Sequence, residues 1–257
     1  MTDRSVSACI VTYNSADVIR TVLDSLLEYT QDRMLQIYVV DNCSIDNTRD
    51  IVRAAYPQVT LLESAVNQGF GAGHNQVLGK LTSSYHVIVN PDIRLTEDVL
   101  SSLAQYLDDN PDVVMVTPKI LNEDGTEQFL PKRRPKIHYL LGGRLEKRGA
   151  IFQKWRDAYT RRKEQLDKPT EIDFSTGCFT MIRTEVFEKL GGFDEGYFMY
   201  FEDADLTRRA QAFGKTLFLP SCSVVHTWER ASTKSTKYFK IQLRSMLRYF
   251  GKWAFKR

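Results

Sequence analysis

Five short apolar segments, rich in β-branched residues, recur along the first 117 residues of this 257-residue chain. Such segments are typical of strands that are buried on both faces of a parallel sheet. Helical patterns separate them. Residues 18–27, for example, form one apolar stripe at helical spacing, with Asn14 or Ser15 as the expected N-cap. This alternation predicts an α/β fold with a doubly wound, mostly parallel sheet. The expected strands are residues 7–12, 37–40, 59–62, 86–89 and 113–117.

The pattern changes after Pro118. Residues 122–125 predict a hairpin turn, and residues 131–170 predict a long basic excursion with some helix. Helices are expected from Thr184 to the Gly191-Gly192 pair and from Glu202 to about Phe213, followed by a basic, aromatic helix at the C-terminus. Further strands are expected at residues 179–182, 216–219 and 223–226.

Composition excludes several classes of protein. No apolar run approaches the roughly 20 residues of a membrane-spanning helix, and the first residues show no signal-peptide pattern. The four cysteines form no CxxC pair, which argues against a zinc knuckle or a disulfide framework. We therefore expect a cytoplasmic protein with reduced thiols, either soluble or bound to a surface. The cysteines are Cys9, Cys43, Cys178 and Cys222.

The net charge of +3 hides an asymmetry. Residues 234–257 contain eight Lys or Arg and no acid, so the preceding residues carry a net charge of −5. A second basic segment, residues 132–163, has twelve bases against two acids. Such segments favour an anionic partner such as an acidic membrane or a phosphorylated substrate. The acidic body argues against a nucleic-acid enzyme.

Polar residues follow four of the expected strands. Ligands of doubly wound sheets bind beyond the carboxyl ends of the strands. Helix capping explains any one of these clusters, but four at the same end of one sheet predict a crevice for a ligand rich in hydroxyls and phosphates. The closely spaced glycines of the third cluster would let backbone approach such a ligand. The clusters are Thr12-Tyr13-Asn14, Asp41-Asn42-Cys43-Ser44, residues 67–75 and Asn90-Pro91-Asp92.

Acidic residues supply candidates for chemistry. Asp92 is the metal candidate of the first half, and His226, at a strand end, could be a second ligand of the same ion. Glu202, Asp203 and Asp205 follow an aromatic run. Apolar surroundings raise the pKa of a carboxylate and make it a better general base.

These residues together resemble the family-two, inverting, GT-A-fold glycosyltransferases, within them the bacterial rhamnosyltransferase-like branch. The resemblance runs from about Ser5 to Ser232. It rests on the four clusters above, extended at the second by Ile45-Asp46-Asn47-Thr48, and on Thr176-Gly177-Cys178-Phe179, Gly191-Gly192-Phe193-Asp194-Glu195 and Tyr200-Phe201-Glu202-Asp203-Ala204-Asp205-Leu206.

The resemblance implies a role for each matching position. Asp203 would be the catalytic base with Glu202 beside it, and Gly177-Cys178 would help to form the acceptor pocket. Mg²⁺ or Mn²⁺ would bind Asp92 and His226. One position departs from the usual DxD motif, because Asn90 replaces its first acid. The nucleotide-sugar site would be formed by Thr12, Tyr13, Asn14, Asp41, Asn42, Asn67, Gly69, Gly71, Asn90 and Asp92.

The resemblance also implies an organisation. One GT-A domain would span residues 1–232, with a nucleotide-sugar half to about 118 and an acceptor half from about 119, and residues 233–257 would form the C-terminal helix. The donor would be a nucleotide diphosphate sugar, with dTDP-L-rhamnose the best match, and the acceptor a glycan or lipid-linked hydroxyl in cell-surface polysaccharide synthesis. The C-terminal helix either packs on the body or holds the protein to anionic lipid on the inner face of the cell membrane.

Two rival classes stay open from the residues alone. A sugar nucleotidyltransferase would show a basic, glycine-rich loop directly after the first strand, where Thr12-Tyr13-Asn14 stands instead. A non-catalytic, membrane-associated nucleotide-sugar binding protein would not need the acids at 202–205. The sequence also leaves the oligomeric state open, a homodimer included.

Overall fold

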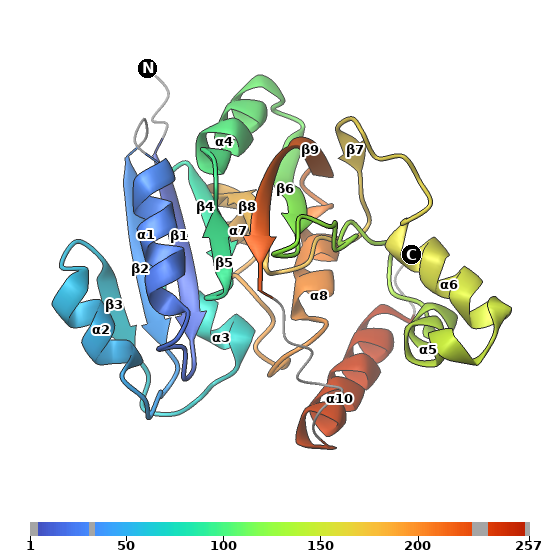
Figure 1. The fold of residues 1–257 in the computed structure, drawn as a ribbon. Coiled ribbons are helices and arrows are strands. Elements are labelled where there is room, and N and C mark those ends of the chain that lie inside the picture. The colour runs from blue at the N-terminus through green and yellow to red at the C-terminus, as the bar shows by residue number, and fades with distance from the viewer. Residues whose placement is uncertain (1–4, 31–33, 228–235, 255–257) are drawn as a thin grey trace.

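The computed structural model describes residues 5–30, 34–227 and 236–254 (Figure 1). One nine-stranded sheet has the order β3-β2-β1-β4-β8-β6-β9-β5, and β7 pairs with β9. Its strands are β1 (Val6–Thr12), β2 (Leu35–Asp41), β3 (Thr60–Glu63), β4 (Tyr85–Val89), β5 (Ile93–Leu95), β6 (Val113–Leu121), β7 (Thr170–Glu171), β8 (Phe179–Arg183) and β9 (Lys215–His226).

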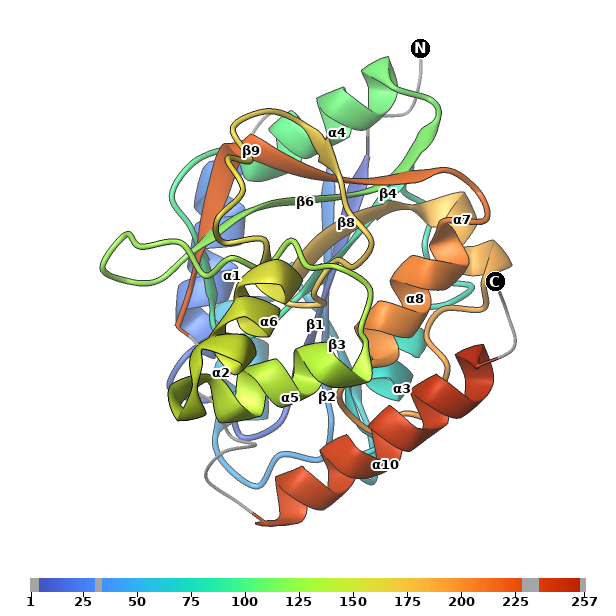
Figure 2. The same ribbon diagram turned by 90° about the vertical axis from the view of Figure 1, so that its right-hand side faces the viewer.

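Helices cover both faces of this sheet (Figures 1 and 2). Apolar side chains of α1, α2 and α4 pack on one face, and those of α3, α7 and α8 pack on the other. The helices are α1 (Ile19–Tyr29), α2 (Thr48–Ala55), α3 (Phe70–Asn75), α4 (Val99–Asp109), α5 (Ile137–Leu145), the 3₁₀ helix η1 (Glu146–Arg148), α6 (Ala150–Thr160), α7 (Thr184–Lys189), α8 (Glu202–Ala210) and α10 (Thr236–Trp253).

Strand direction places the candidate site. β1, β2, β3, β4, β6 and β9 point one way, while β5, β7 and β8 point the other way. The predicted α/β fold with a mostly parallel sheet is therefore confirmed. Because β1, β2, β4 and β9 end at the same side, the polar residues that follow them gather there.

Several local predictions are wrong. Neither Asn14 nor Ser15 caps α1 with its side chain, because Asn14 Oδ1 instead accepts from the Ile45 amide at 2.9 Å. The two strands expected at 216–219 and 223–226 are one strand, β9, whose register against β6 shifts after Pro118. The helix expected to reach Phe213 ends at Ala210.

The turn and the excursion are confirmed. After β6, the Asn122 amide donates to the Thr126 carbonyl at 2.8 Å, and Gly125 has a φ of 81° that suits a tight turn. The excursion contains α5 and α6, which lie beyond the sheet, and α5 lies next to α10 in both views (Figures 1 and 2).

The C-terminal helix packs on the body through one face. Tyr249 and Ser245 are buried, and Met246, Phe250 and Trp253 join a core with side chains of α5, α6 and α8. The expected boundary at 232/233 lies outside the described residues, so the division into segments stays a prediction. Within the described ranges, no helix has the length and apolar character needed to cross a bilayer.

Candidate active site

The ends of β1 and β2 carry the first predicted ligand-binding residues. Thr12 and Asp41 are fully buried, and the Thr12 hydroxyl donates to Asp41 Oδ1 at 3.2 Å. The other oxygen of Asp41 accepts from the Ser44 amide at 2.9 Å and lies 3.7 Å from Arg49 Nε. Asp41 therefore organises the loop after β2 through protein donors, and its direct contact with a nucleotide stays a prediction.

The loops after β1 and β2 hold each other in place. The Asn14 amide donates to Ser44 Oγ at 2.9 Å, and Asn14 has a φ of 54°, in the left-handed region that asparagine tolerates. Tyr13, between Thr12 and Asn14 in this loop, is 48% exposed. An exposed aromatic ring at the carboxyl end of a parallel sheet offers a stacking surface for a flat ligand group.

Asn42 and Asn67 fix the glycine loop. Asn42 Nδ2 donates to the Gly69 carbonyl at 2.9 Å, and Asn42 Oδ1 accepts from the Gln68 amide at 3.0 Å. Asn67 Oδ1 accepts from the Gly69 amide at 2.9 Å. Both asparagines thus hydrogen-bond to the backbone of this loop, Asn42 as donor and acceptor and Asn67 as acceptor.

The glycines themselves face protein. Gly69 has a φ of 90°, and a Cβ at this position would lie 2.1 Å from the Phe198 carbonyl oxygen. A Cβ on Gly71 would lie 2.8 Å from the Cβ of Phe193. The absence of side chains lets the loop pack closely on residues 193–198, so these glycines shape the site through packing, and their contact with a ligand stays a prediction.

Asp92 and His226 meet as predicted. His226 Nε2 lies 3.2 Å from Asp92 Oδ1. Gln128 Nε2 donates to the His226 carbonyl at 2.8 Å, which turns Gln128 Oε1 toward His226 Nδ1 at 3.0 Å. An amide oxygen only accepts, so the neutral imidazole carries its proton on Nδ1 and presents the Nε2 lone pair to Asp92.

This pair fits a divalent cation. Asp92 Oδ1 is buried and accepts no hydrogen bond from the described residues. Two lone pairs at this separation need a proton or a cation between them. Adjacent ligands of an octahedral ion with bonds near 2.1 Å are about 3 Å apart, close to the observed spacing. Asn90 Nδ2 lies 3.5 Å from the same imidazole nitrogen.

The protein supplies few ligands for such an ion. Among residues 5–30, 34–227 and 236–254, no group of three or more His, Cys, Asp or Glu side chains converges as a metal site. A Mg²⁺ or Mn²⁺ held by Asp92 and His226 would therefore take its other ligands from diphosphate oxygens and water, which is how Mg²⁺ is commonly bound.

The two candidate catalytic acids differ in environment. Glu202 is buried, and its Oε2 has no hydrogen-bond partner among the described residues. Burial raises the pKa of Glu202 well above its ordinary value, and the neighbouring Asp203 carboxylate adds to this increase. Burial also raises the pKa of Asp203, against the opposing charge of Lys132. Asp203 is partly exposed to solvent, whereas Glu202 is buried.

The turn directly before α8 has a strained backbone and sets the position of Asp203. Tyr200 and Phe201 have φ values of 71° and 69°, which non-glycine residues adopt at a cost of about 1–3 kcal/mol each. At the start of α8, Asp203 Oδ2 then accepts from the Gly177 amide at 3.2 Å. Gly177 therefore lies beside the acid, whereas the Cys178 side chain is buried, and the role of this pair in an acceptor pocket stays a prediction.

Hydrogen bonds join the three groups of predicted residues. The Asn90 amide donates to the Cys178 carbonyl at 2.8 Å, which links the metal pair to the segment beside Asp203. The Phe70 amide donates to the Phe198 carbonyl at 2.9 Å, which links the glycine loop to the turn before α8. The candidate site is thus one connected structure at one end of the sheet.

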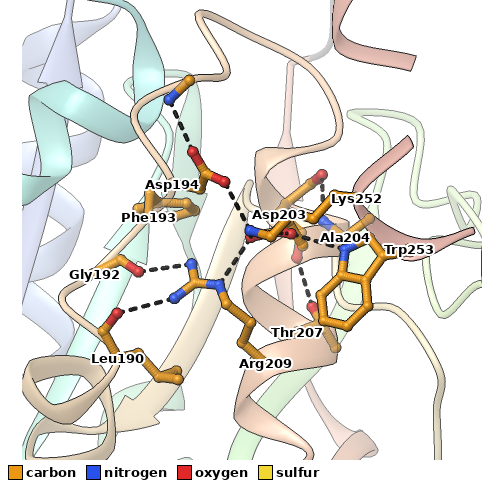
Figure 3. A network of polar contacts seen from close by, with 12 residues as sticks. Leu190, Gly192, Phe193, Asp194, Asp203, Ala204, Thr207, Arg209, Lys252 and Trp253 are labelled. Atoms are coloured by element: carbon orange, nitrogen blue, oxygen red, sulfur yellow. Dashed lines mark hydrogen bonds and ion pairs between the residues drawn. The ribbon is translucent and has the colours of Figure 1, made fainter. Parts of the chain in front are cut away.

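The third acid, Asp205, has a structural partner set. It is fully buried and accepts from Arg209 Nε at 2.8 Å, from Lys252 Nζ at 2.9 Å and from Trp253 Nε1 at 2.8 Å. Figure 3 shows Lys252 and Trp253 of α10 near Arg209 of α8 in this network of polar contacts. Both carboxylate oxygens of Asp205 accept hydrogen bonds from these side chains. Asp205 therefore anchors α10 and is not a candidate for the catalytic base.

Asp194 is the second anchor of α10. Burial opposes its ionisation, but hydrogen bonds from Lys252 and Arg248 outweigh this effect and lower the pKa of Asp194 to about 2. The Lys252 ammonium lies 2.7 Å from Asp194 Oδ2 (Figure 3). Because it also donates to Asp205, Lys252 bridges the two acids.

Three contributors to the site were not predicted from sequence. Gln128 orients His226, Arg49 approaches Asp41, and Lys132 opposes the raised pKa of Asp203. Gln128 and Lys132 lie in or near the irregular excursion, where no periodic pattern indicates which side chains point inward. Arg49 follows the motif directly, so its proximity to Asp41 could have been suspected.

A family model described as "Glycosyl transferase family 2" matches residues 7–191. The chain belongs to this family. The family, the GT-A fold and the enzyme class predicted from the motifs of this glycosyltransferase are therefore confirmed. The two alternatives, a sugar nucleotidyltransferase and a non-catalytic binding protein, are disfavoured.

Two relatives of the glycosyltransferase are named for rhamnosyl transfer. It is 29% identical over 232 residues to N-acetylglucosaminyl-diphospho-decaprenol L-rhamnosyltransferase of Mycobacterium tuberculosis, covering 84% of this chain and 74% of the relative. It is 25% identical over 259 residues to rhamnosyltransferase WbbL of Escherichia coli, covering 95% of this chain and 91% of the relative.

Solved structures share the fold of the glycosyltransferase. GalNAc-T7 with UDP, GalNAc and Mn²⁺ has a TM-score of 0.66 at 15% identity, and the match covers 95% of this chain but only 47% of that protein. The mannosyltransferase PcManGT of Pyrobaculum calidifontis, in complex with GDP-Man and Mn²⁺, has a TM-score of 0.62 at 22% identity, with 96% and 63% covered.

Proposed function

We propose that this glycosyltransferase moves L-rhamnose from dTDP-L-rhamnose to a hydroxyl of a glycan or lipid-linked acceptor, with inversion at the anomeric carbon. The transferred sugar is supported by the names of both relatives above, and a lipid-linked acceptor by the name of the first. The single observation that carries the chemistry is Asp203, a partly exposed carboxylate with a raised pKa at the start of α8.

Asp203 acts as the general base in this proposal. It accepts the proton of the acceptor hydroxyl while that oxygen forms a bond to the anomeric carbon. The bond from that carbon to the diphosphate oxygen breaks at the same time, and the diphosphate leaves with the electron pair. The Gly177 amide, 3.2 Å from Asp203 Oδ2, orients the carboxylate.

The metal pair serves the leaving group. Asp92 and His226 would hold Mg²⁺ or Mn²⁺, and a bound ion supplies Lewis-acid stabilisation of the departing diphosphate. Asn90, in place of a second acid, keeps the protein's own negative charge low where the diphosphate would lie. Thr12, Asp41, Asn42, Asn67 and the glycine loop hold the nucleotide pocket in shape, with Tyr13 as the exposed ring beside it.

We further propose that the protein works at the inner face of the cell membrane. A lipid-linked acceptor would be presented there. The chain is expected to divide into a nucleotide-sugar half and an acceptor half, followed by the C-terminal helix. This division suits one substrate that arrives from water and another that arrives from the membrane. A homodimer is compatible with this arrangement.

A donor screen tests the function. The purified protein is incubated with dTDP-L-rhamnose, UDP-GlcNAc, GDP-mannose and a lipid-linked or short glycan acceptor, with Mg²⁺, Mn²⁺ or a chelator, and nucleotide diphosphate release is measured. We expect release from dTDP-L-rhamnose in the presence of metal, and little from the same reaction with Asp203→Asn. Preference for another donor would reject the rhamnosyl assignment, and full activity in excess chelator would reject the metal role.

A further inference from the structure

The outward face of α10 carries an apolar stripe. Phe239, Leu243 and Leu247 are spaced four residues apart, so they lie on one side of the helix, and their exposed fractions are 36%, 41% and 63%. The opposite side packs on the body through Ser245 and Tyr249. The apolar stripe therefore stays exposed to solvent while the opposite side of α10 packs on the body.

A second stripe on α5 adjoins the first. Ile137 and Leu141 are 62% and 44% exposed, and Arg144 follows on the same side of the helix. The Arg144 guanidinium lies 4.1 Å from the centre of the Phe239 ring, which brings the two stripes together. Figures 1 and 2 both show α5 next to α10.

The inner faces of the two helices share one core. Tyr139 and Leu140 of α5 pack in the same cluster as Met246 and Phe250 of α10. This shared core fixes the orientation of the helices relative to each other. We call the surface formed by Ile137, Leu141, Phe239, Leu243 and Leu247 the α5–α10 face.

The charge around the α5–α10 face has one sign. Neither α5 nor α10 contains an acidic residue. The nearby Glu146 of η1 lies 2.7 Å from Arg162 and is thereby neutralised. Exposed bases in or beside the two helices include Lys136, Arg144, Lys147, Arg148, Lys237, Lys240 and Arg244, while the exposed Arg248 of α10 pairs with Asp194.

We propose that the α5–α10 face docks on an anionic lipid bilayer. Exposed apolar side chains surrounded by lysine and arginine match an interface in which acyl chains lie beneath negatively charged headgroups. The partner is a lipid surface, because a basic face with no acid of its own is poorly suited to pair with a second copy of itself. This inference rests on the proposed function, in which the acceptor is linked to a lipid. It adds that two helices far apart in sequence, α5 and α10, contact the membrane together.

The test measures co-sedimentation with vesicles of mixed phosphatidylcholine and phosphatidylglycerol, and with vesicles of phosphatidylcholine alone. The wild-type protein is expected to bind the anionic vesicles at low salt and to dissociate as salt is raised. The paired changes Leu243→Ser/Leu247→Ser and Ile137→Ser/Leu141→Ser are each expected to weaken binding at least about tenfold, since each removes two apolar anchors.

Controls separate docking from folding. Ile45→Ser/Val66→Ser changes two exposed apolar residues outside the α5–α10 face and is expected to leave vesicle binding unchanged. Thermal unfolding of every variant should match that of the wild type, because the substituted side chains are exposed. Lys240→Gln/Arg244→Gln is expected to weaken binding to anionic vesicles only.

Three results would overturn the proposal. If the wild-type protein fails to bind anionic vesicles, an anionic bilayer is not the partner of this face. Normal binding by Ile137→Ser/Leu141→Ser shows that α5 takes no part. Light scattering that shows a wild-type dimer, converted to monomer by Leu243→Ser/Leu247→Ser, assigns the face to a second copy of the chain. Transfer to a soluble acceptor is measured in parallel, so that loss of vesicle binding with normal transfer separates this proposal from the proposed function.

Discussion

The indole nitrogen of Trp253 donates a 2.8 Å hydrogen bond to Asp205, two residues beyond Asp203. The C-terminal helix is thereby attached to the helix that presents the candidate base. Lys252 and Arg248 extend the attachment to Asp194, in the segment that leads into the strained turn before α8. Positioning of Asp203 therefore depends on residues about fifty positions later in the chain.

Trp253→Phe is expected to lower the free energy of unfolding by about 1–2 kcal/mol, because it removes the donor to a carboxylate but keeps an aromatic ring. Asp205→Asn should cost more, about 3–5 kcal/mol, since Arg209 then loses its buried counter-charge and Lys252 keeps only Asp194. Urea unfolding measures both. If Asp205→Asn is as stable as the wild type, the anchoring role assigned to Asp205 is wrong.

The pH dependence of transfer should report on Asp203. The base must be ionised, and burial raises its pKa, so kcat/KM should fall on the acid side at a pH above the ordinary range of an aspartate. Lys132→Met removes the charge that opposes this increase, so the acid limb should move to higher pH. Lys136→Met is the matched control, because its ammonium lies over the ring of Tyr139. If the acid limb of the kcat/KM profile is unchanged in Lys132→Met, the assignment of this limb to Asp203 is contradicted.

Asp203→Asn separates chemistry from binding. The amide cannot take up the acceptor proton, so transfer should fall by at least about 10²-fold while donor affinity, measured by calorimetry, stays within a few-fold of the wild type. Glu202→Gln should retain most of the activity, because the Glu202 side chain is buried away from solvent. The reverse order of effects would make Glu202 the base.

Glu202 should also affect stability in a pH-dependent way. Its folded-state pKa is raised, so the folded state holds a proton that the unfolded chain releases above about pH 4.3. The stabilisation by this proton is complete below that pH and is lost as pH rises through the folded-state pKa. Glu202→Gln cannot lose a proton, so its stability relative to the wild type should increase by up to about 1.4 kcal/mol per pH unit over that window. Parallel stability–pH curves would show that the raised pKa is wrong.

Gln128 should control metal affinity through His226. Gln128→Leu removes the acceptor that holds the proton on His226 Nδ1, and we expect Mn²⁺ binding in the presence of dTDP to weaken by about 10–100-fold. Gln128→Glu keeps an acceptor at this position and should be milder. Calorimetry and Mn²⁺ electron paramagnetic resonance give the affinity without any assay of transfer. Equal affinities in all three proteins would remove Gln128 from the metal site.

The sequence by itself determined the sheet. The β-branched runs at 7–12, 37–40, 86–89 and 113–117 became buried strands because runs of this kind satisfy a strand covered on both faces. Strand direction then brought Asp41, Asp92 and His226 to one end, since polar residues that follow parallel strands lie together. These inferences needed only periodicity and topology.

The tertiary structure alone decided what each polar residue does. Three acids at the start of α8 look equivalent along the chain. In the structure, Glu202 is buried and its Oε2 has no hydrogen-bond partner among the described residues, Asp203 reaches solvent beside Gly177, and Asp205 is held by side chains of α8 and α10. Their difference comes from groups far away in sequence, such as Lys132 and Trp253. Burial, counter-charges and hydrogen-bond partners are properties of the packed structure, and short-range patterns do not encode them.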